Sequence, residues 1–126
     1  MKIKFLLDTN FPMVPGQFHV DVFEQLRRLA VCDFFVVDLS VEELDRLAKK
    51  GGKAAAAAKV GRILVRREGV RVIPSGKAGD ADEAIRRVAK REGMVVCTQD
   101  AALKAALRRR GVRIATLRQR KYIELE

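Results

Sequence analysis

Cysteine and histidine are scarce in this chain of 126 residues, which contains only Cys32, Cys97 and His19. The cysteines lie far apart and outside any Cys-x-x-Cys spacing, so we expect small buried hydrophobic residues in a reducing cytoplasm and no structural zinc site. Without a second histidine, neither a Cys–His pair nor a Ser–His–Asp triad can be built except around His19. We interpret His19 as a polar residue at a helix start.

Long apolar runs and tryptophan are also missing. No run approaches the roughly 20 residues that span a bilayer. Asp8 and Asn10 interrupt any signal-peptide pattern, and no helix joins a basic face to exposed aromatic residues. We therefore expect a cytoplasmic protein with no membrane partner. The length and the 48% hydrophobic content are typical of one folded domain, residues 1–126.

Positive charge is in excess and unevenly distributed. The net charge is +10, and residues 1–45 carry four Lys or Arg against eight Asp or Glu, so residues 46–126 hold the whole surplus. Such a surplus favours a polyanionic partner, of which nucleic acid is the commonest. The alternative is that an Arg-rich surface serves solubility or high-temperature ion-pair networks.

Apolar runs alternate with segments of helical periodicity along the chain. We expect strands at residues 2–7, 34–37, 71–73, 94–97 and 112–117, with an edge strand from the tail at 118–126. Helices are expected near 19–30, 40–50, 54–67, 80–90 and 101–110, and loops at 11–18 and 74–79. Ser40 and Glu43 match a capping box for the second helix. The alternation predicts a three-layer α/β/α sandwich with a mainly parallel sheet.

Acidic side chains recur at the predicted strand ends and helix starts. Asp8 follows the first strand, Asp100 follows the fourth, and Glu43, Asp80 and Asp82 lie on first turns of helices. Each has a structural explanation, because such residues also favour caps and turns. Ligands of parallel sheets, however, bind outside the carboxyl ends of the strands.

Acids gathered at that edge would repel one another and raise each other's pKa values unless a cation compensates. Mg²⁺ and Mn²⁺ prefer carboxylate and water oxygens, and they can lower the pKa of a bound water beside a phosphoryl group. An acidic pocket in a basic protein therefore favours chemistry on a phosphodiester chain.

The order of these motifs resembles that of the PIN-domain ribonucleases. The matching stretches are Phe5-Leu6-Leu7-Asp8-Thr9-Asn10, Glu43-Leu44 after Ser40, Asp82-Glu83-Ala84-Ile85, and Thr98-Gln99-Asp100 with Leu103. The resemblance covers nearly the whole chain. It implies a five-stranded parallel sheet in an α/β/α sandwich, and Mg²⁺- or Mn²⁺-dependent endonuclease activity on single-stranded or structured RNA.

Carried over by motif, the acids that bind metal would be Asp8, Glu43, Asp82 and Asp100. Thr9, Asn10 and Thr98 would position these acids or a water. Glu43 is preferred to Glu42 because the family's acid precedes a leucine, and Asp80 is either a further ligand or only a cap. For RNA binding we single out the cations Lys104, Arg108, Arg109, Arg110, Lys49, Lys50 and Lys53, although a solvated helix face explains the arginine run equally well.

Within the family, the opening stretch and Val14-Pro15-Gly16-Gln17-Phe18 are most similar to archaeal relatives of small-subunit rRNA-processing PIN proteins. That similarity implies pre-rRNA as substrate, in ribosome biogenesis. Toxin-type PIN ribonucleases with an antitoxin partner are the nearest alternative, and a non-catalytic RNA-binding module of a ribosome-assembly complex is another. A homodimer remains open. A haloacid-dehalogenase-type phosphotransfer enzyme is disfavoured, because its second aspartate would fall at Asn10.

Overall fold

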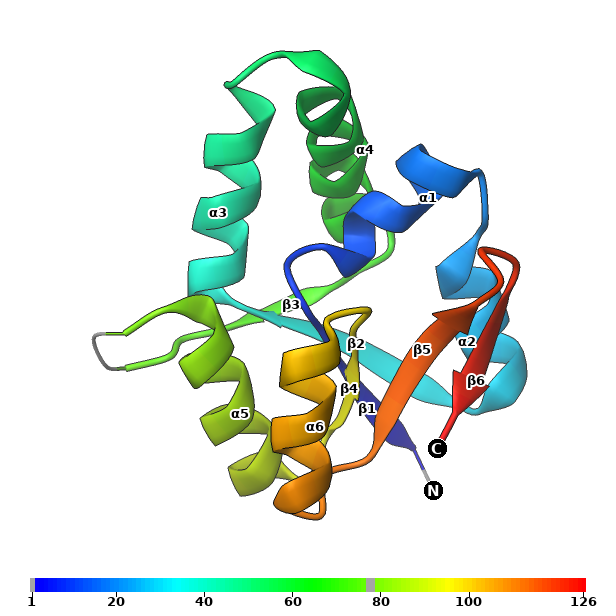
Figure 1. The fold of residues 1–126 in the computed structure, drawn as a ribbon, viewed down its shortest axis with the longest axis vertical. Helices are drawn as coiled ribbons and strands as arrows, with labels where there is room; N and C mark the ends of the chain where they lie inside the picture. The colour runs from blue at the N-terminus through cyan, green and yellow to red at the C-terminus, as the bar shows by residue number, and fades with distance from the viewer. Residues whose placement is uncertain (1, 77–78) are drawn as a thin grey trace.

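The computed structural model describes residues 2–76 and 79–126. In those residues it has six strands, six α-helices and one 3-10 helix (Figure 1). In chain order they are β1 (Ile3–Leu7), η1 (Phe11–Met13), α1 (Val14–Phe18), α2 (Val22–Leu29), β2 (Cys32–Val37), α3 (Asp38–Ala48), α4 (Gly52–Arg67), β3 (Arg71–Ile73), α5 (Ala81–Glu92), β4 (Val95–Cys97), α6 (Ala101–Arg109), β5 (Ile114–Arg118) and β6 (Tyr122–Leu125). No helix of the described ranges has the length and apolarity to cross a membrane.

The strands form one sheet in the order β3-β2-β1-β4-β5-β6. The first five strands in the chain run parallel to their neighbours, and β6 runs antiparallel to β5. The prediction of a mainly parallel sheet with an edge strand from the tail is confirmed, and the sheet has six strands where five parallel ones were implied. The register places Leu7 of β1 opposite Cys97 of β4.

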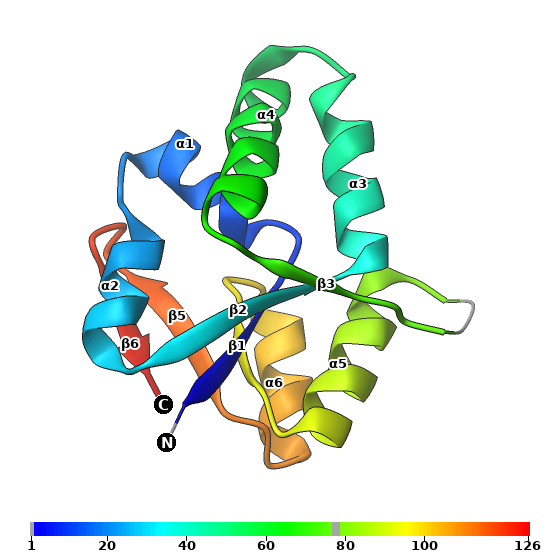
Figure 2. The same cartoon turned by 180° about the vertical axis from the view of Figure 1, so that it is seen from behind.

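Helices cover both faces of the sheet, as the α/β/α prediction requires. Alternate residues of β1 point to opposite sides: Phe5 and Leu7 join a core with α2 and α4, whereas Leu6 joins a core with α5 and α6. This period of two fits a strand that is buried on both faces. Figures 1 and 2 show α3 and α4 side by side as a helical hairpin that stands beyond one edge of the sheet.

The sheet ends differently at its two edges. At one edge, Gln25 of α2 donates to the Lys121 carbonyl and accepts from the Ile123 amide, so it holds β6 in place. At the other edge, β3 has only three residues, its Arg71 and Val72 side chains are exposed, and a proline follows it. Cys97 is buried and Cys32 only half-buried, and both are free thiols.

The loop predicted at residues 11–18 is instead helical, as η1 and α1. Pro12 and Pro15 lie in the first turns of these helices. Proline is favoured there because its missing N–H would have no partner in a helix start anyway. His19 ends α1 in the left-handed conformation (φ 56°), and α2 starts three residues later with Asp21 as its cap. The expected place of His19 at a helix start is therefore wrong.

The capping box at Ser40 is also wrong. Helix α3 begins at Asp38, directly after β2, so Ser40 and Glu43 both lie inside the helix. Asp38 accepts hydrogen bonds from the backbone N–H groups of Leu39 (2.8 Å) and Ser75 (3.2 Å). Of the loop predicted at 74–79, residues 77 and 78 lie outside the described residues.

Candidate active site

The candidate site lies at the carboxyl edge of the sheet, where β1 and β4 end side by side. Asp8 follows β1 and is 7% exposed. Its Oδ1 accepts a hydrogen bond from the Thr9 amide at 2.8 Å, and its Oδ2 accepts from the Thr98 hydroxyl at 2.7 Å. The backbone N–H of Asp8 also donates to the Cys97 carbonyl, which extends the pairing of the two strands. The two carboxylate oxygens of Asp8 are thus oriented by residues that follow two neighbouring strands, Thr9 after β1 and Thr98 after β4.

Thr98 links Asp8 to Asp100. Besides donating to Asp8, the Thr98 hydroxyl accepts from the Asp100 amide at 3.0 Å. Asp100 in turn caps α6, since its Oδ1 accepts from the Leu103 amide at 2.8 Å. Asp100 is exposed, so its carboxylate faces solvent while one oxygen holds the helix start.

Thr9 and Asn10 have different surroundings. The buried Thr9 hydroxyl donates to the Ser40 hydroxyl at 2.9 Å, which fastens the β1 loop to the first turn of α3. Asn10 is exposed, and its carbonyl accepts from the Met13 amide at the start of η1. The described contacts of Asn10 therefore organise the backbone after Asp8.

Helix α5 carries Asp82 into the same region. Asp80 caps this helix by accepting from the Glu83 amide at 2.9 Å, which is one of the two roles considered for it. Asp82, on the first turn, is half-buried, whereas Asp80 is exposed. The start of α5 thus places the Asp82 carboxylate towards the site and leaves the Asp80 carboxylate exposed to solvent.

Glu43 approaches from α3. It is half-buried while Glu42 is exposed, and Glu43 is one of the charges that raise the pKa of Asp82. Both glutamates line a hollow of about 290 Å³ with Asp80 and Arg46. Glu43 therefore lies on the side of α3 that faces α5.

The electrostatics show that these acids influence one another. Burial raises the pKa of the Asp8 carboxyl above its ordinary value of 3.8. The hydrogen bonds from Thr98 and Thr9 oppose this shift, and the charges of Asp82 and Asp100 add to it. A buried carboxylate beside two others is costly when ionised, because each charge disfavours the next.

Asp82 shows the same effect. Burial raises its pKa, and Asp100 is the strongest of the neighbouring charges that raise it further. Arg86, one helical turn along α5, lowers the pKa again, while Asp80 and Glu43 raise it. Carboxylates from β1, α3, α5 and the start of α6 thus share one electrostatic environment.

This donor set fits a hydrated hard cation. Within residues 2–76 and 79–126, no three Asp, Glu, His or Cys side chains form a ready-made metal cage. Mg²⁺ does not require one, since it is usually bound through one or two carboxylates and keeps several waters. Its charge would offset the burial and the repulsion that together raise the pKa values of Asp8 and Asp82. The site has oxygen donors only, which disfavours zinc.

The cations predicted to bind RNA do not form one group. Arg108 is paired with Glu126 at 2.8 Å, and Lys104 is half-buried, with a pKa lowered by burial and by the nearby Arg118 and Arg108. Arg109 and Arg110 are exposed at the end of α6. The remaining three, Lys49, Lys50 and Lys53, are exposed at the tip of the α3–α4 hairpin.

Three features of the site were missed from the sequence. Ser40 bonds Thr9, and Gln99 accepts from the Thr116 hydroxyl and the Leu117 amide, which ties the loop after β4 to β5. Neither partner is close in sequence, so no local signal points to these bonds. Arg86 did have a signal, because it lies four residues after Asp82 and therefore on the same side of a helix.

Comparisons with known proteins agree with this arrangement. A family model described as "PIN like domain" matches residues 5–120. Ribonuclease VapC4 of Methanocaldococcus jannaschii is 32% identical over 128 residues, which cover 97% of this chain and 95% of that protein. The solved structure of the PIN domain endonuclease Utp24 has a TM-score of 0.79 at 26% identity and covers 98% of this chain and 90% of its own.

A domain of a functionally unknown protein from Methanocaldococcus jannaschii has the same fold, with a TM-score of 0.64 at 20% identity, over 92% of this chain and 91% of that one. The family match spans nearly all of the strands and helices that build the carboxyl edge, and it includes all four acidic positions. On the sequence and the fold together, the chain belongs to the PIN domain family.

Proposed function

We propose that the protein is a metal-dependent endoribonuclease that hydrolyses RNA phosphodiester bonds with Mg²⁺ or Mn²⁺. The observation that carries the proposal is the buried Asp8, which Thr98 orients and whose pKa is raised by burial and further by the charges of Asp82 and Asp100. An arrangement of carboxylates that repel one another persists when it serves a cation. The names of the similar proteins, a ribonuclease and an endonuclease, support the reaction class.

In this mechanism, Asp8, Asp82 and Asp100 would hold the ion directly or through waters. When bound, the ion would lower the pKa of a water and stabilise charge on a phosphoryl oxygen. Glu43 would hold the ion or orient the attacking water. Thr98 fixes the carboxylate of Asp8, and Thr9 with Ser40 fixes the loop that carries it. The attacking water gives up one proton to the surrounding solvent as its oxygen bonds to phosphorus, one P–O bond to ribose breaks, and the leaving oxygen takes up a proton.

Processing of rRNA during ribosome biogenesis is the cellular role we propose first. Its support is the resemblance of the opening stretch to archaeal relatives of small-subunit rRNA-processing PIN proteins. A toxin-type ribonuclease held by an antitoxin is the second candidate. Exposed apolar side chains on α4 favour it, since Ile63 is 61% exposed and Val60 adjoins an apolar hollow that also contains Phe18. Such a surface suits a protein partner.

The test is cleavage of precursor rRNA and of total RNA by the wild type beside Asp8→Asn, with the new ends mapped. We expect cleavage with Mg²⁺ or Mn²⁺, none with EDTA, and at least about a hundredfold loss in Asp8→Asn, which equals about 2.7 kcal/mol of activation free energy. RNA binding should persist in the variant.

Equal cleavage by the two proteins would rule out this site. New cleavage ends found only in precursor rRNA would support a processing enzyme. New ends found in one class of mature RNA would support a toxin. If the wild type binds RNA but does not cleave it with either metal ion, the protein is a non-catalytic RNA-binding module.

A further inference from the structure

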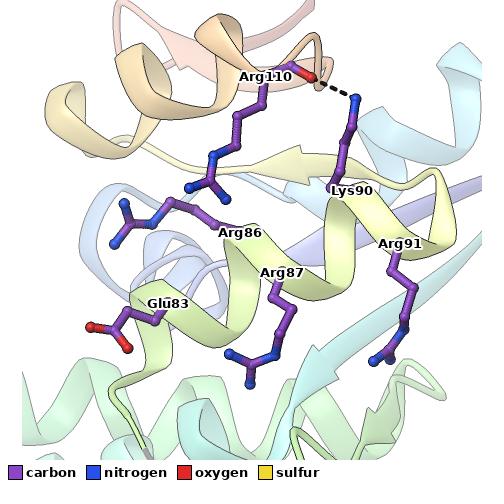
Figure 3. Close-up of a pocket in the computed structure, with 6 residues that line it drawn as sticks. All are labelled: Glu83, Arg86, Arg87, Lys90, Arg91 and Arg110. Atoms are coloured by element: carbon purple, nitrogen blue, oxygen red, sulfur yellow. Dashed lines mark hydrogen bonds between the residues drawn. The ribbon is translucent and has the colours of Figure 1, made fainter.

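A basic hollow lies outside the acidic site, between α5 and the end of α6. It has a volume of about 650 Å³ and is lined by five cations and one acid: Glu83, Arg86, Arg87, Lys90, Arg91 and Arg110. Figure 3 shows Lys90 reaching up to the end of α6 and the Arg110 side chain extending back towards α5. We call this hollow the α5–α6 groove.

Carbonyl oxygens, which carry no net charge, hold most of the groove cations. Lys90 donates to the Arg110 carbonyl at 2.9 Å, and Arg87 donates to the Ser75 carbonyl at 3.1 Å. Arg86 approaches the Asp82 carbonyl at 3.5 Å. A carbonyl orients a cation but does not neutralise it, so these side chains keep their full charge in defined positions.

Ion pairs neutralise some of the arginines elsewhere on the molecule. Arg27, Arg62, Arg108 and Arg118 each have a carboxylate within 3.3 Å. Among the described residues, Arg91 is the one groove cation in an ion pair, with its neighbour Glu92. The groove therefore concentrates positive charge, of which the nearby Asp82 carboxylate offsets part at Arg86. A row of anions placed along it would relieve the remaining repulsion between Arg86, Lys90 and Arg110.

The groove begins at the acidic site. Asp82, Arg86 and Lys90 follow one another at intervals of four residues on α5, so they lie along one side of the helix over roughly 12 Å. That length spans a few consecutive phosphates of a strand. In the part of the chain that the structure describes, the groove lining has no aromatic side chain, so it offers charge to phosphates and no surface for stacking bases.

We propose that the α5–α6 groove binds the phosphate backbone of the RNA segment that flanks the scissile bond. The position next to Asp82 rests on the proposed nuclease function, whereas the binding of a polyanion rests on the groove itself. Because the contacts are to phosphates, the groove sets the path of the strand and carries no sequence preference. Sequence or shape selectivity then belongs to other parts of the surface.

The test uses two triple variants of equal charge in the Asp8→Asn background, so that cleavage does not disturb binding. The groove variant is Arg86→Gln/Lys90→Gln/Arg110→Gln. The control variant is Lys59→Gln/Arg66→Gln/Arg67→Gln on α4, whose three side chains are exposed and lie outside the groove. Binding of a fluorescent single-stranded RNA is measured by anisotropy across a salt series, and circular dichroism checks that both variants fold.

We expect the groove variant to lose at least about tenfold in affinity at 0.1 M salt. The slope of log K against log salt should fall by about 2, since each lost phosphate contact removes about 0.7. The control variant should keep a slope close to the parent's. Equal losses in both variants, or an unchanged slope in the groove variant, would overturn the proposal. The proposal would also be overturned if the groove variant kept its RNA binding and instead lost binding to an acidic protein.

The two proposals fail in different ways. If the wild type cleaves nothing but the groove variant still loses RNA affinity and slope, the groove stands and the nuclease function falls. If the wild type cleaves and the groove substitutions leave RNA affinity and slope unchanged, the groove proposal falls alone.

Discussion

Asp8 is held in a place that disfavours its charge. Its carboxylate is almost fully buried, it accepts two hydrogen bonds, and Asp82 and Asp100 add repulsion. The hydrogen bonds fix its direction without fully offsetting the burial, because its pKa remains raised. The residue therefore keeps a defined orientation at some cost in stability.

A stability prediction follows from the raised pKa of Asp8. The folded protein holds this proton more tightly than the unfolded chain, so stability falls as pH rises from the ordinary value of 3.8 through the raised pKa. Asp8→Asn removes the charge and keeps the shape. Without divalent ions, we expect the variant to melt at a higher temperature than the wild type at pH 7, and the gap to close below pH 3.8. Melting curves between pH 3 and 8 with EDTA test this.

If Asp8→Asn melts at a lower temperature than the wild type at pH 7, the stabilisation from the Thr9 and Thr98 hydrogen bonds exceeds the cost of burying the Asp8 charge. Asp21→Asn serves as a control for lost carboxylate charge, because Asp21 is an exposed cap far from the site in sequence.

Single residues show what sequence can predict at this scale. The cap at Asp80 could be recognised as one possible role because its partner, the Glu83 amide, is three residues away. Ser40 met the same local pattern, yet its hydroxyl bonds Thr9, thirty-one residues away. A capping motif describes only neighbours in the chain, so tertiary partners that compete for the same hydroxyl are invisible to it.

At the scale of elements, periodicity predicted the β-strands and long helices, while the short helices were missed. Residues 11–18 contain two prolines and a glycine and were expected to be a loop. The structure uses Pro12 and Pro15 to start η1 and α1. Gly16 and Gly61 serve close packing, because a Cβ at either would lie 3.2 Å from a neighbouring backbone atom. Such approaches depend on how α4 meets η1 and α1, which no local pattern contains.

Gly61 provides a prediction at this scale. A Cβ at residue 61 would lie 3.2 Å from the carbonyl carbon and oxygen of Pro12. Alanine in place of glycine adds about 1 kcal/mol of helix propensity, whereas overpacking costs about 1–3 kcal/mol. Since the atoms that must move are backbone of a proline-fixed turn, we expect Gly61→Ala to lower the free energy of unfolding by about 1 kcal/mol. Urea unfolding measures it.

Lys59→Ala, at an exposed position of the same helix, should change stability by less than about 0.5 kcal/mol. If Gly61→Ala proves more stable than the wild type, η1 is able to shift, and the close approach of the two elements is not a constraint.

At the scale of the whole molecule, charge is separated between a small acidic edge and a basic remainder. The net charge of +10 attracts RNA, yet it also repels a divalent cation. The local carboxylates must therefore outweigh the general repulsion, which salt screens beyond about 8 Å at 0.15 M ionic strength. The sequence predicted this separation in outline, but it could not show which cations are neutralised by ion pairs.

A metal ion that binds to the native state should stabilise the whole fold. At 0.15 M salt, Mg²⁺ or Mn²⁺ at about a hundred times its dissociation constant should stabilise the wild type by about 2.7 kcal/mol, and EDTA should reverse the effect. Asp8→Asn should respond much less. Differential scanning calorimetry with and without each ion provides the measurement. Equal shifts in both proteins would place the ion elsewhere.

The short edge strand β3 has a consequence for behaviour at high concentration. A sheet edge with free backbone groups can pair with another chain and so begin aggregation. Here the exposed edge offers only three residues, it carries the charge of Arg71, and Pro74 ends it without an N–H to donate. A second copy would find too few hydrogen bonds to extend the sheet and would meet a like charge. The same short strand that completes the fold therefore protects the protein against edge-to-edge association.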